Sequence, residues 1–220
     1  MAAHAPGYRV AVTLFPEPTL DELRAAVQQC TACDLYKDAT QAVFGEGPPD
    51  AALVLIGEVP GDKEDLAGHP FVGPAGKILD EALEEVGIRR DRAYLTNAVK
   101  HFKFERRGKV RIHKKPNAAE IRACSQWWEA ELDRLRPDVL GILGATAGQA
   151  VFGSSFRVTR QRGKWLDGPG GVATLATIHP SAVLRAPPER RDDEYAGLVT
   201  DLRELSTRVR GTSGRRGGAA

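Results

Sequence analysis

The stretch AALVLIGEVPGDKEDLAGHPFVGPAGKILD, residues 51–80, decides the fold. It opens with an uninterrupted apolar run, which is typical of a strand buried on both faces. A turn rich in glycine and proline follows, and 74–87 then has the apolar spacing of an amphipathic helix that stops at Gly87. A buried strand, a loop and a covering helix in this order are the building unit of a parallel sheet.

The rest of the chain repeats this alternation of strand and helix. Further strands are predicted at 93–99, 138–144 and 172–178. Further helices are predicted at 19–29, 117–136, 145–152 and 191–208. Capping-box spacing marks two of the helix starts, at Thr19 and at Asn117. We therefore expect an α/β fold of three layers, α/β/α, around a central four-stranded, mostly parallel sheet.

Size and composition are those of an ordinary globular protein. At 220 residues, 42% of them hydrophobic, the chain can bury one core. We expect an irregular proline-rich segment at 1–18, one domain at 19–208 and a disordered Gly/Arg-rich tail at 209–220. The sequence has no apolar run that could span a bilayer and no secretory pattern at its start, so we expect a cytoplasmic protein, and a monomer.

The basic residues are concentrated in one segment. From Lys100 to Lys115 the sequence holds eight Lys and Arg residues and one acidic residue, a net charge of +7 in a chain whose total is +2. Phe102 and Phe104 lie among these charges, and aromatic rings offer stacking surfaces for bases. The segment, interpreted as a loop over 100–116, favours nucleic acid as a partner. The alternative is a solvated basic loop.

Polar residues follow the predicted strands at the ends where parallel sheets bind ligands. Glu58 follows the first strand, Asn97 ends the second, and His179 follows the fourth. The basic segment leaves the second strand and carries His113, so a carboxylate, an amide and two histidines are predicted to meet at one edge. Three of these residues have a plainer alternative: Asn97 as a turn residue, His179 as a hydrogen-bonded strand-end residue, and His113 as a phosphate contact.

The sequence contains three cysteines, Cys30, Cys33 and Cys124. An odd number argues against a framework of disulfides. Cys30 and Cys33 form a C-x-x-C pair, which is the spacing of metal and cluster sites and also of redox pairs. Unrelated buried thiols are the remaining alternative.

Five segments form a set that is far more specific than any one of them. They are the C-x-x-C pair, GEVPGDKEDLAGHPFVGPAG (57–76), YLTNAVKHFKF (94–104), KVRIH (109–113) and HPS (179–181). Over about 19–208 the chain resembles the uracil-DNA glycosylase superfamily, in its iron–sulfur branch related to the family-four enzymes. NAVKH and RIH resemble the UdgX subgroup, which excises uracil from DNA and becomes covalently attached to the abasic sugar.

The resemblance implies how uracil would be bound. Phe71 would stack on the flipped base, although its plainer interpretation is a core aromatic residue. Asn97 would pair with the edge of uracil, Gly57 would line the base site, and His179 would stabilise negative charge on the departing base. The partner would be uracil-containing DNA, preferably single-stranded, because the base must leave the stack.

The resemblance also implies the reactive groups. Glu58 would sit near the sugar and accept a hydrogen bond from one ring nitrogen of His113, whose other nitrogen would attack the sugar in place of water. Three cations would bind DNA: Lys100, Lys109 and Arg111. Lys100 and Arg111 would hold either the loop or the phosphates, and a solvated side chain is a further alternative for Lys100. The competing functions are a turnover glycosylase that uses water, and a non-catalytic nucleic-acid-binding module with a zinc site.

The resemblance assigns the thiols to a metal centre. Cys30, Cys33, His101 and Cys124 would hold a structural [4Fe–4S] cluster, although three thiolates and one imidazole suit zinc equally well by spacing alone. The sequence departs from the UdgX pattern at two positions. Val59 stands where glutamine is usual, and Val110 stands where arginine is common, which puts one polar support and one phosphate contact in doubt.

Overall fold

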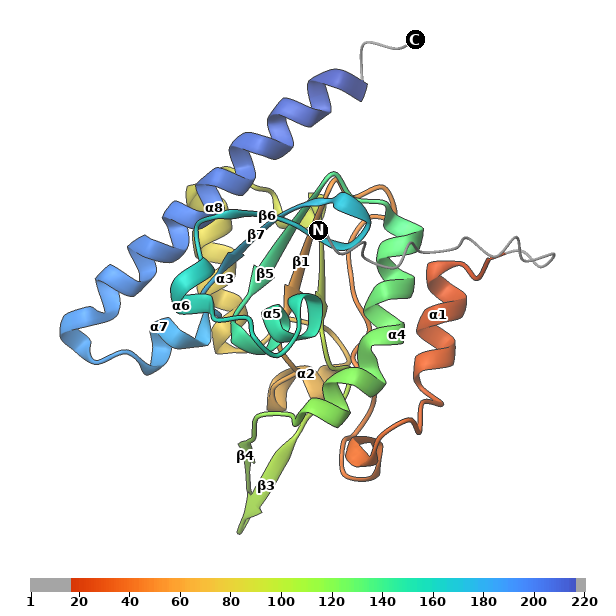
Figure 1. Cartoon of the computed structure of the whole chain (residues 1–220). Helices are drawn as coiled ribbons and strands as arrows, with labels where there is room; N and C mark the ends of the chain where they lie inside the picture. The colour runs from red at the N-terminus through yellow and green to blue at the C-terminus, as the bar shows by residue number, and fades with distance from the viewer. Residues whose placement is uncertain (1–16, 217–220) are drawn as a thin grey trace, which may run out of the picture.

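The computed structural model describes residues 17–216 and confirms a three-layer α/β/α fold (Figure 1). The central sheet has five strands in the order β2-β1-β5-β7-β6. Four of them are the predicted parallel strands: β1 (Leu53–Gly57), β2 (Ala93–Asn97), β5 (Val139–Leu143) and β7 (Ala173–Thr177). The predicted count of four is wrong, because β6 (Trp165–Asp167) adds an antiparallel edge strand. Three residues are too short to give a recognisable pattern.

Helices cover both faces of the sheet. One face carries α3 (Pro74–Glu85) and α8 (Pro188–Arg216), and the other carries α4 (Ala118–Leu135) and α5 (Ala145–Phe152), with α1 (Leu20–Val27) outside α4. The predicted capping boxes at Thr19 and Asn117 are both present. The short elements are α2 (Asp62–Ala67), α6 (Val158–Gln161), α7 (Ser181–Arg185) and the 3-10 turns Asp34–Lys37, Arg90–Arg92 and Pro169–Gly171.

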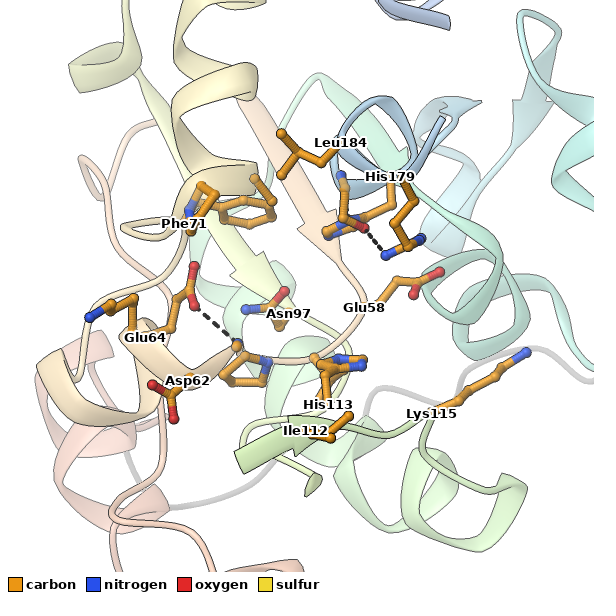
Figure 2. Close-up of a pocket in the computed structure, with 18 residues that line it drawn as sticks. Glu58, Asp62, Glu64, Phe71, Asn97, Ile112, His113, Lys115, His179 and Leu184 are labelled. Carbon is orange, nitrogen blue, oxygen red and sulfur yellow. Dashed lines mark hydrogen bonds between the residues drawn. The ribbon is translucent and has the colours of Figure 1, made fainter. Parts of the chain in front are cut away.

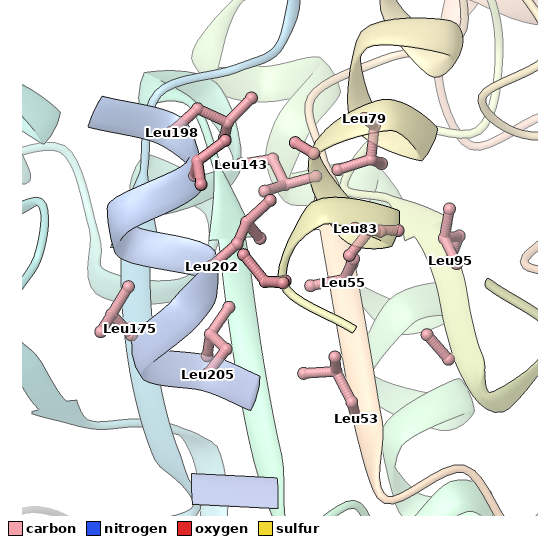
Figure 3. Close-up of a cluster of buried hydrophobic side chains, with 14 of the residues drawn as sticks. Leu53, Leu55, Leu79, Leu83, Leu95, Leu143, Leu175, Leu198, Leu202 and Leu205 are labelled. Carbon is pink, nitrogen blue, oxygen red and sulfur yellow. The ribbon is translucent and has the colours of Figure 1, made fainter. Parts of the chain in front are cut away.

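The core follows from the two-residue period of the strands. Leu53 and Leu55 point to the face covered by α3 and α8, while Val54 and Ile56 point to the face covered by α4 and α5. Figure 3 shows the leucine-rich layer between α8, α3 and the strands. Every residue of β1 is buried, which explains its continuous apolar sequence. Within residues 17–216, no helix is both long and apolar enough to cross a membrane.

The last helix is longer than the sequence indicates. The prediction is 191–208, whereas α8 runs from Pro188 to Arg216 and takes in 209–216 of the predicted tail. Just beyond the predicted end, the guanidinium of Arg210 donates to the carbonyl of Val86 at 3.1 Å. Residues 1–16 of the predicted irregular segment and 217–220 of the predicted tail lie outside the described residues.

The basic segment is a β-hairpin where the sequence indicated a loop. Strands β3 (Phe104–Arg107) and β4 (Val110–His113) pair in antiparallel register, joined by a two-residue turn in which Gly108 has φ +60°. The hairpin projects from the body next to α2 (Figure 1). His113 pairs with Phe104 at the base of the hairpin, so the histidine lies where the hairpin meets the body.

Lys100 lies in the core, and its predicted contact with DNA is wrong. Its side chain is 0% exposed, and Nζ lies 2.7 Å from Glu131 Oε2 and 2.6 Å from Thr96 Oγ1. The Glu131 carboxylate also accepts from the Gly45 amide and the Tyr94 hydroxyl. Lys100 therefore neutralises a buried carboxylate that links α4 to β2.

This buried pair predicts a specific stability effect. Lys100→Met should lower the free energy of unfolding by about 3–5 kcal/mol, because it leaves the Glu131 charge buried without a partner. Lys100→Met combined with Glu131→Gln should recover part of that loss, since the charge is gone and an amide oxygen still accepts. Urea denaturation measures both.

Lys109→Met is the matched control, because Lys109 is exposed and should change stability by less than about 0.5 kcal/mol. If Lys100→Met left stability unchanged and weakened DNA binding instead, the buried placement would be wrong.

Candidate active site

Five of the predicted site residues line one cavity of about 760 Å³ at the carboxyl edge of the sheet (Figure 2). They arrive on different elements. Glu58 follows β1, Phe71 precedes α3, Asn97 ends β2, His113 ends β4 and His179 follows β7. The topology therefore brings the predicted carboxylate, amide, aromatic ring and histidines together.

One end of the cavity is a slot beside an aromatic ring. Phe71 is buried and has φ +58°, and a Cβ added at Gly76 would lie 1.8 Å from its carbonyl oxygen. A Cβ at Gly57 would lie 2.5 Å from Phe71 Cζ and 2.4 Å from Asn97 Oδ1. In the described part of the chain the Asn97 side-chain amide has no hydrogen-bond partner, so it is free to pair with a ligand.

His179 is held in one tautomer. Its Nδ1 accepts from the backbone N–H of Ser181 at 3.2 Å, and Ser181 Oγ lies 2.7 Å from the same nitrogen. A backbone N–H can only donate, so Nδ1 is the acceptor and the ring proton resides on Nε2. Burial lowers the pKa of His179 to about 4, against the opposing charge of Glu58. The ring is therefore a neutral hydrogen-bond donor at pH 7.

Glu58 rests on the N-terminus of α5. Its Oε1 accepts from the Thr146 backbone N–H at 2.8 Å, and a Cβ at Gly144, which has φ +98°, would lie 2.4 Å from the same oxygen. The predicted hydrogen bond from His113 to Glu58 is not formed among the described residues, where the one hydrogen bond of this carboxylate is that to Thr146. Glu58 acts on His113 through its charge alone.

His113 lies exposed on the rim of the cavity. Its ring centroid is 6.0 Å from that of Phe102, which supports it from the body side. Desolvation lowers the pKa of His113, Arg185 adds to the decrease, and the charge of Glu58 opposes it. The imidazole is therefore neutral at pH 7 and has a free ring-nitrogen lone pair.

Arg111 fixes the hairpin to the body. Nε lies 2.6 Å from Asp62 Oδ1, and Nη1 lies 2.6 Å from Asp65 Oδ2. The guanidinium also lies 5.3 Å and 5.1 Å from the ring centroids of Phe102 and Phe104. The side chain is only 11% exposed, so of its two predicted roles the ion pairs bear out that of holding the segment, and contact with phosphates stays a prediction.

Three cations on the cavity were missed by the sequence interpretation: Lys63, Lys115 and Arg185. The two lysines are exposed and have no ion pair in residues 17–216. Lys115 belongs to the basic run and could have been chosen from it, whereas Lys63 lies in α2 among acidic residues. Lys109 lies exposed at the hairpin turn, outside the cavity.

The predicted thiol ligands contact α4 and the residues that follow β2. Cys33 and Cys124 form a hydrogen-bonded pair; this bond lowers the pKa of Cys33 to about 6 and raises the pKa of Cys124. Cys124 also accepts from the Lys100 backbone N–H at 3.5 Å, and Cys30 Sγ accepts from Trp127 Nε1 at 3.2 Å. All three thiols therefore pack around α4.

His101 is the fourth predicted ligand. His101 is buried, and its Nδ1 has no hydrogen-bond partner, which is an unusual state for a buried ring nitrogen. Across residues 17–216, no three His, Cys, Asp or Glu side chains converge tightly enough for one ion. Three thiols and an unpartnered imidazole nevertheless fit the chemistry of a cluster, in which each iron takes one ligand.

Known proteins are similar in sequence to this chain. The profile of the family described as "Uracil DNA glycosylase superfamily" matches residues 44–203. The type-4 uracil-DNA glycosylase of Thermotoga maritima is 39% identical over 186 residues, covering 84% of this chain and 91% of that protein. The Archaeoglobus fulgidus type-4 enzyme is 34% identical, over 85% and 93% of the two chains. The type-5 enzyme of Thermus thermophilus is 33% identical, over 63% and 68%. With its α/β fold and its cavity at the sheet edge, this chain belongs to the uracil-DNA glycosylase superfamily.

Proposed function

We propose that this protein excises uracil from DNA and that His113 then bonds to the abasic sugar, as in the UdgX subgroup. The observation that carries the proposal is the position of His113 on the rim of the cavity that Phe71, Asn97 and His179 line. The relatives described as type-4 uracil-DNA glycosylases support the first step. The second step rests on this chain's own histidine.

The cavity suits a flipped pyrimidine. Phe71 would stack on the ring, and the free amide of Asn97 would pair with the edge on which uracil and cytosine differ. Any side chain larger than hydrogen at Gly57 would fill the slot. His179, neutral and with its proton on Nε2, would donate to a carbonyl oxygen of uracil as negative charge develops there.

Bond cleavage and capture would proceed in a balanced sequence. The electron pair of the N-glycosidic bond leaves with uracil, whose charge His179 stabilises, while Glu58 stabilises the sugar cation. The ring-nitrogen lone pair of His113 then forms the bond to the anomeric carbon. The proton on the other ring nitrogen is lost to Glu58 or solvent, and uracil takes up one proton.

Proximity would let His113 outcompete water. An imidazole fixed beside the sugar has an effective concentration far above that of a solvent molecule. Arg111 holds β4 against α2 and thereby limits the motion of His113. Because imidazole is a poor leaving group from an unactivated sugar, the adduct persists and the enzyme turns over once.

Three unpaired cations would contact DNA phosphates. Lys63 and Lys115 flank the cavity and Lys109 lies at the hairpin turn. Single-stranded DNA is the favoured substrate, because its bases need no extraction from a duplex. We expect the protein to act as a monomer.

A turnover glycosylase is the second candidate function. Two observations favour it: Glu58 bonds to Thr146 and makes no hydrogen bond to His113, and Val59 packs with Val99 and Cys124 where it cannot support a polar group. In that case water would complete the reaction and free abasic DNA would accumulate.

A denaturing gel separates the candidates. The protein is mixed with single-stranded DNA that contains one uracil, and we expect a heat-stable protein–DNA band. His113→Ser should abolish the band and retain some excision, because the base-binding residues remain. Val110→Ala, at an exposed position of the same strand as His113, is the control that should retain the band.

Alkali-labile DNA without a band would support the turnover enzyme. Intact DNA would support a non-catalytic nucleic-acid-binding module. A band that survives His113→Ser would refute His113 as the nucleophile.

The fraction of product that is crosslinked should depend on pH through His113. Only the neutral ring can attack, and the pKa of His113 lies below its ordinary value. The ratio of adduct to free abasic DNA should therefore be constant above about pH 6.5, the value of an ordinary histidine, and should fall at lower pH as the ring is protonated. Quenched reactions from pH 8 to pH 5 measure it; a ratio that rises towards acid would contradict a neutral nucleophile.

We also propose a [4Fe–4S] cluster held by Cys30, Cys33, His101 and Cys124. The unpartnered Nδ1 of the buried His101 supports this set, because a buried ring nitrogen without a hydrogen bond is free to bind a metal. The cluster would join the segment after α1 to the start of the hairpin and to α4, which is a structural role.

Metal analysis tests the cluster. The purified protein should be brown and contain iron and acid-labile sulfide. Cys33→Ser should lower both and reduce the unfolding temperature by several degrees, because metal binding contributes to folding. Ser125→Ala, next to Cys124, should change neither. Stoichiometric zinc without iron would contradict the assignment.

A further inference from the structure

A chain of hydrogen bonds stands behind His179 and ends at a residue to which the mechanism above gives no part. Arg185 Nη1 lies 2.8 Å from Ser181 Oγ, and Ser181 Oγ lies 2.7 Å from His179 Nδ1. Ser181 and Arg185 belong to α7, which directly follows His179, and all three residues line the cavity.

The direction of each bond in this chain is forced. The guanidinium of Arg185 has donors only, so Ser181 Oγ must accept from it. His179 Nδ1 already accepts from the Ser181 backbone N–H at 3.2 Å, so it has no proton to give. The hydroxyl proton of Ser181 therefore points at Nδ1, and the only ring proton of His179 is on Nε2.

We propose that Arg185 is a positioning residue that acts through Ser181 Oγ and reinforces the single backbone N–H bond in holding His179 as the neutral tautomer with its proton on Nε2. The hydrogen bond from Arg185 occupies a lone pair of Ser181 Oγ. It thereby disfavours rotation of the hydroxyl into the orientation in which Oγ would accept a hydrogen bond from Nδ1. The other tautomer would present an acceptor to the uracil oxygen and would repel it. This inference rests on the proposed function, in which His179 donates to that oxygen.

The charges around His179 are consistent with this arrangement. Glu58 favours the protonated ring, whereas Arg185 and His113 disfavour it. Arg185 is exposed at the cavity, so its side chain can be replaced without opening the core. The competing role is a direct contact with a DNA phosphate, which an exposed arginine at this place would also suit.

Ring-nitrogen NMR tests the proposal without any need for catalysis. The sequence has five histidines, so a ¹⁵N-histidine-labelled protein gives few signals, and loss of one set in His179→Gln identifies His179. Wild type should show an unprotonated Nδ1 and a protonated Nε2. Arg185→Met and Ser181→Ala should each give a mixture of tautomers, or a ring that is protonated at higher pH than in wild type.

A double-mutant cycle on uracil excision gives the second readout. At saturating DNA, Arg185→Met and Ser181→Ala should each slow single-turnover excision by about three- to tenfold, the effect of one hydrogen bond. The double variant should be no slower than Ser181→Ala, because Arg185 acts through the serine. The dissociation constant for DNA and its dependence on salt should stay near those of wild type.

Lys115→Met is the matched control, because Lys115 is a cation on the same cavity that makes no hydrogen bond to Ser181 or His179. It should reduce the salt dependence of DNA binding by about one charge and leave the His179 signals unchanged. Wild-type His179 signals in Arg185→Met would overturn the proposal. So would a double variant whose loss of excision rate is the product of the two single losses, or an Arg185→Met variant whose only defect is a reduced salt dependence of DNA binding. If the protein excised no uracil at all, the proposed function would fail, and the NMR result would still decide whether Arg185 acts through Ser181 on the tautomer of His179.

Discussion

The ion pairs between Arg111 and the two aspartates of α2 are the interaction on which the site depends. The hairpin β3–β4 pairs with no strand of the main sheet, so nothing in the sheet holds it. Arg111 contributes two short ion pairs and contacts with two aromatic rings, and it lies two residues from His113 on the same strand. An isolated two-stranded hairpin is marginally stable, so the contacts of Arg111 are needed to hold the strand that carries His113 in place.

The remaining groups of the site take their positions from the sheet. β1, β2 and β7 end at the same edge, and each delivers one polar residue there: Glu58, Asn97 and His179. Their surroundings then separate their roles. Glu58 is held by the positive end of α5, whereas His179 is kept neutral by burial and by its hydrogen bonds. The cavity thus offers negative charge on one side of a sugar–base bond and a donor on the other.

The sequence predicts the parts of this protein whose signal is local. Four apolar strands and two capping boxes were recognisable because their patterns lie within a few residues. Ion pairs between residues that are far apart in the sequence were not recognisable. Lys100 belongs to a basic run in the sequence, yet its charge is used by Glu131, 31 residues later. Arg111 is likewise used by Asp62 and Asp65, which no spacing rule connects to it. The hairpin itself was missed because its strands are only four residues long and half of their residues are charged.

The central claim is that an imidazole, and not water, takes the sugar when uracil leaves. Its most direct test is the identity of the amino acid that carries the sugar after reaction with uracil-containing DNA. The complex is digested with nuclease and protease, and the modified peptide is sequenced by mass spectrometry. The account predicts the mass of an abasic sugar on the ring of His113. Sugar on any other residue, or abasic DNA released with no modified peptide, would contradict it.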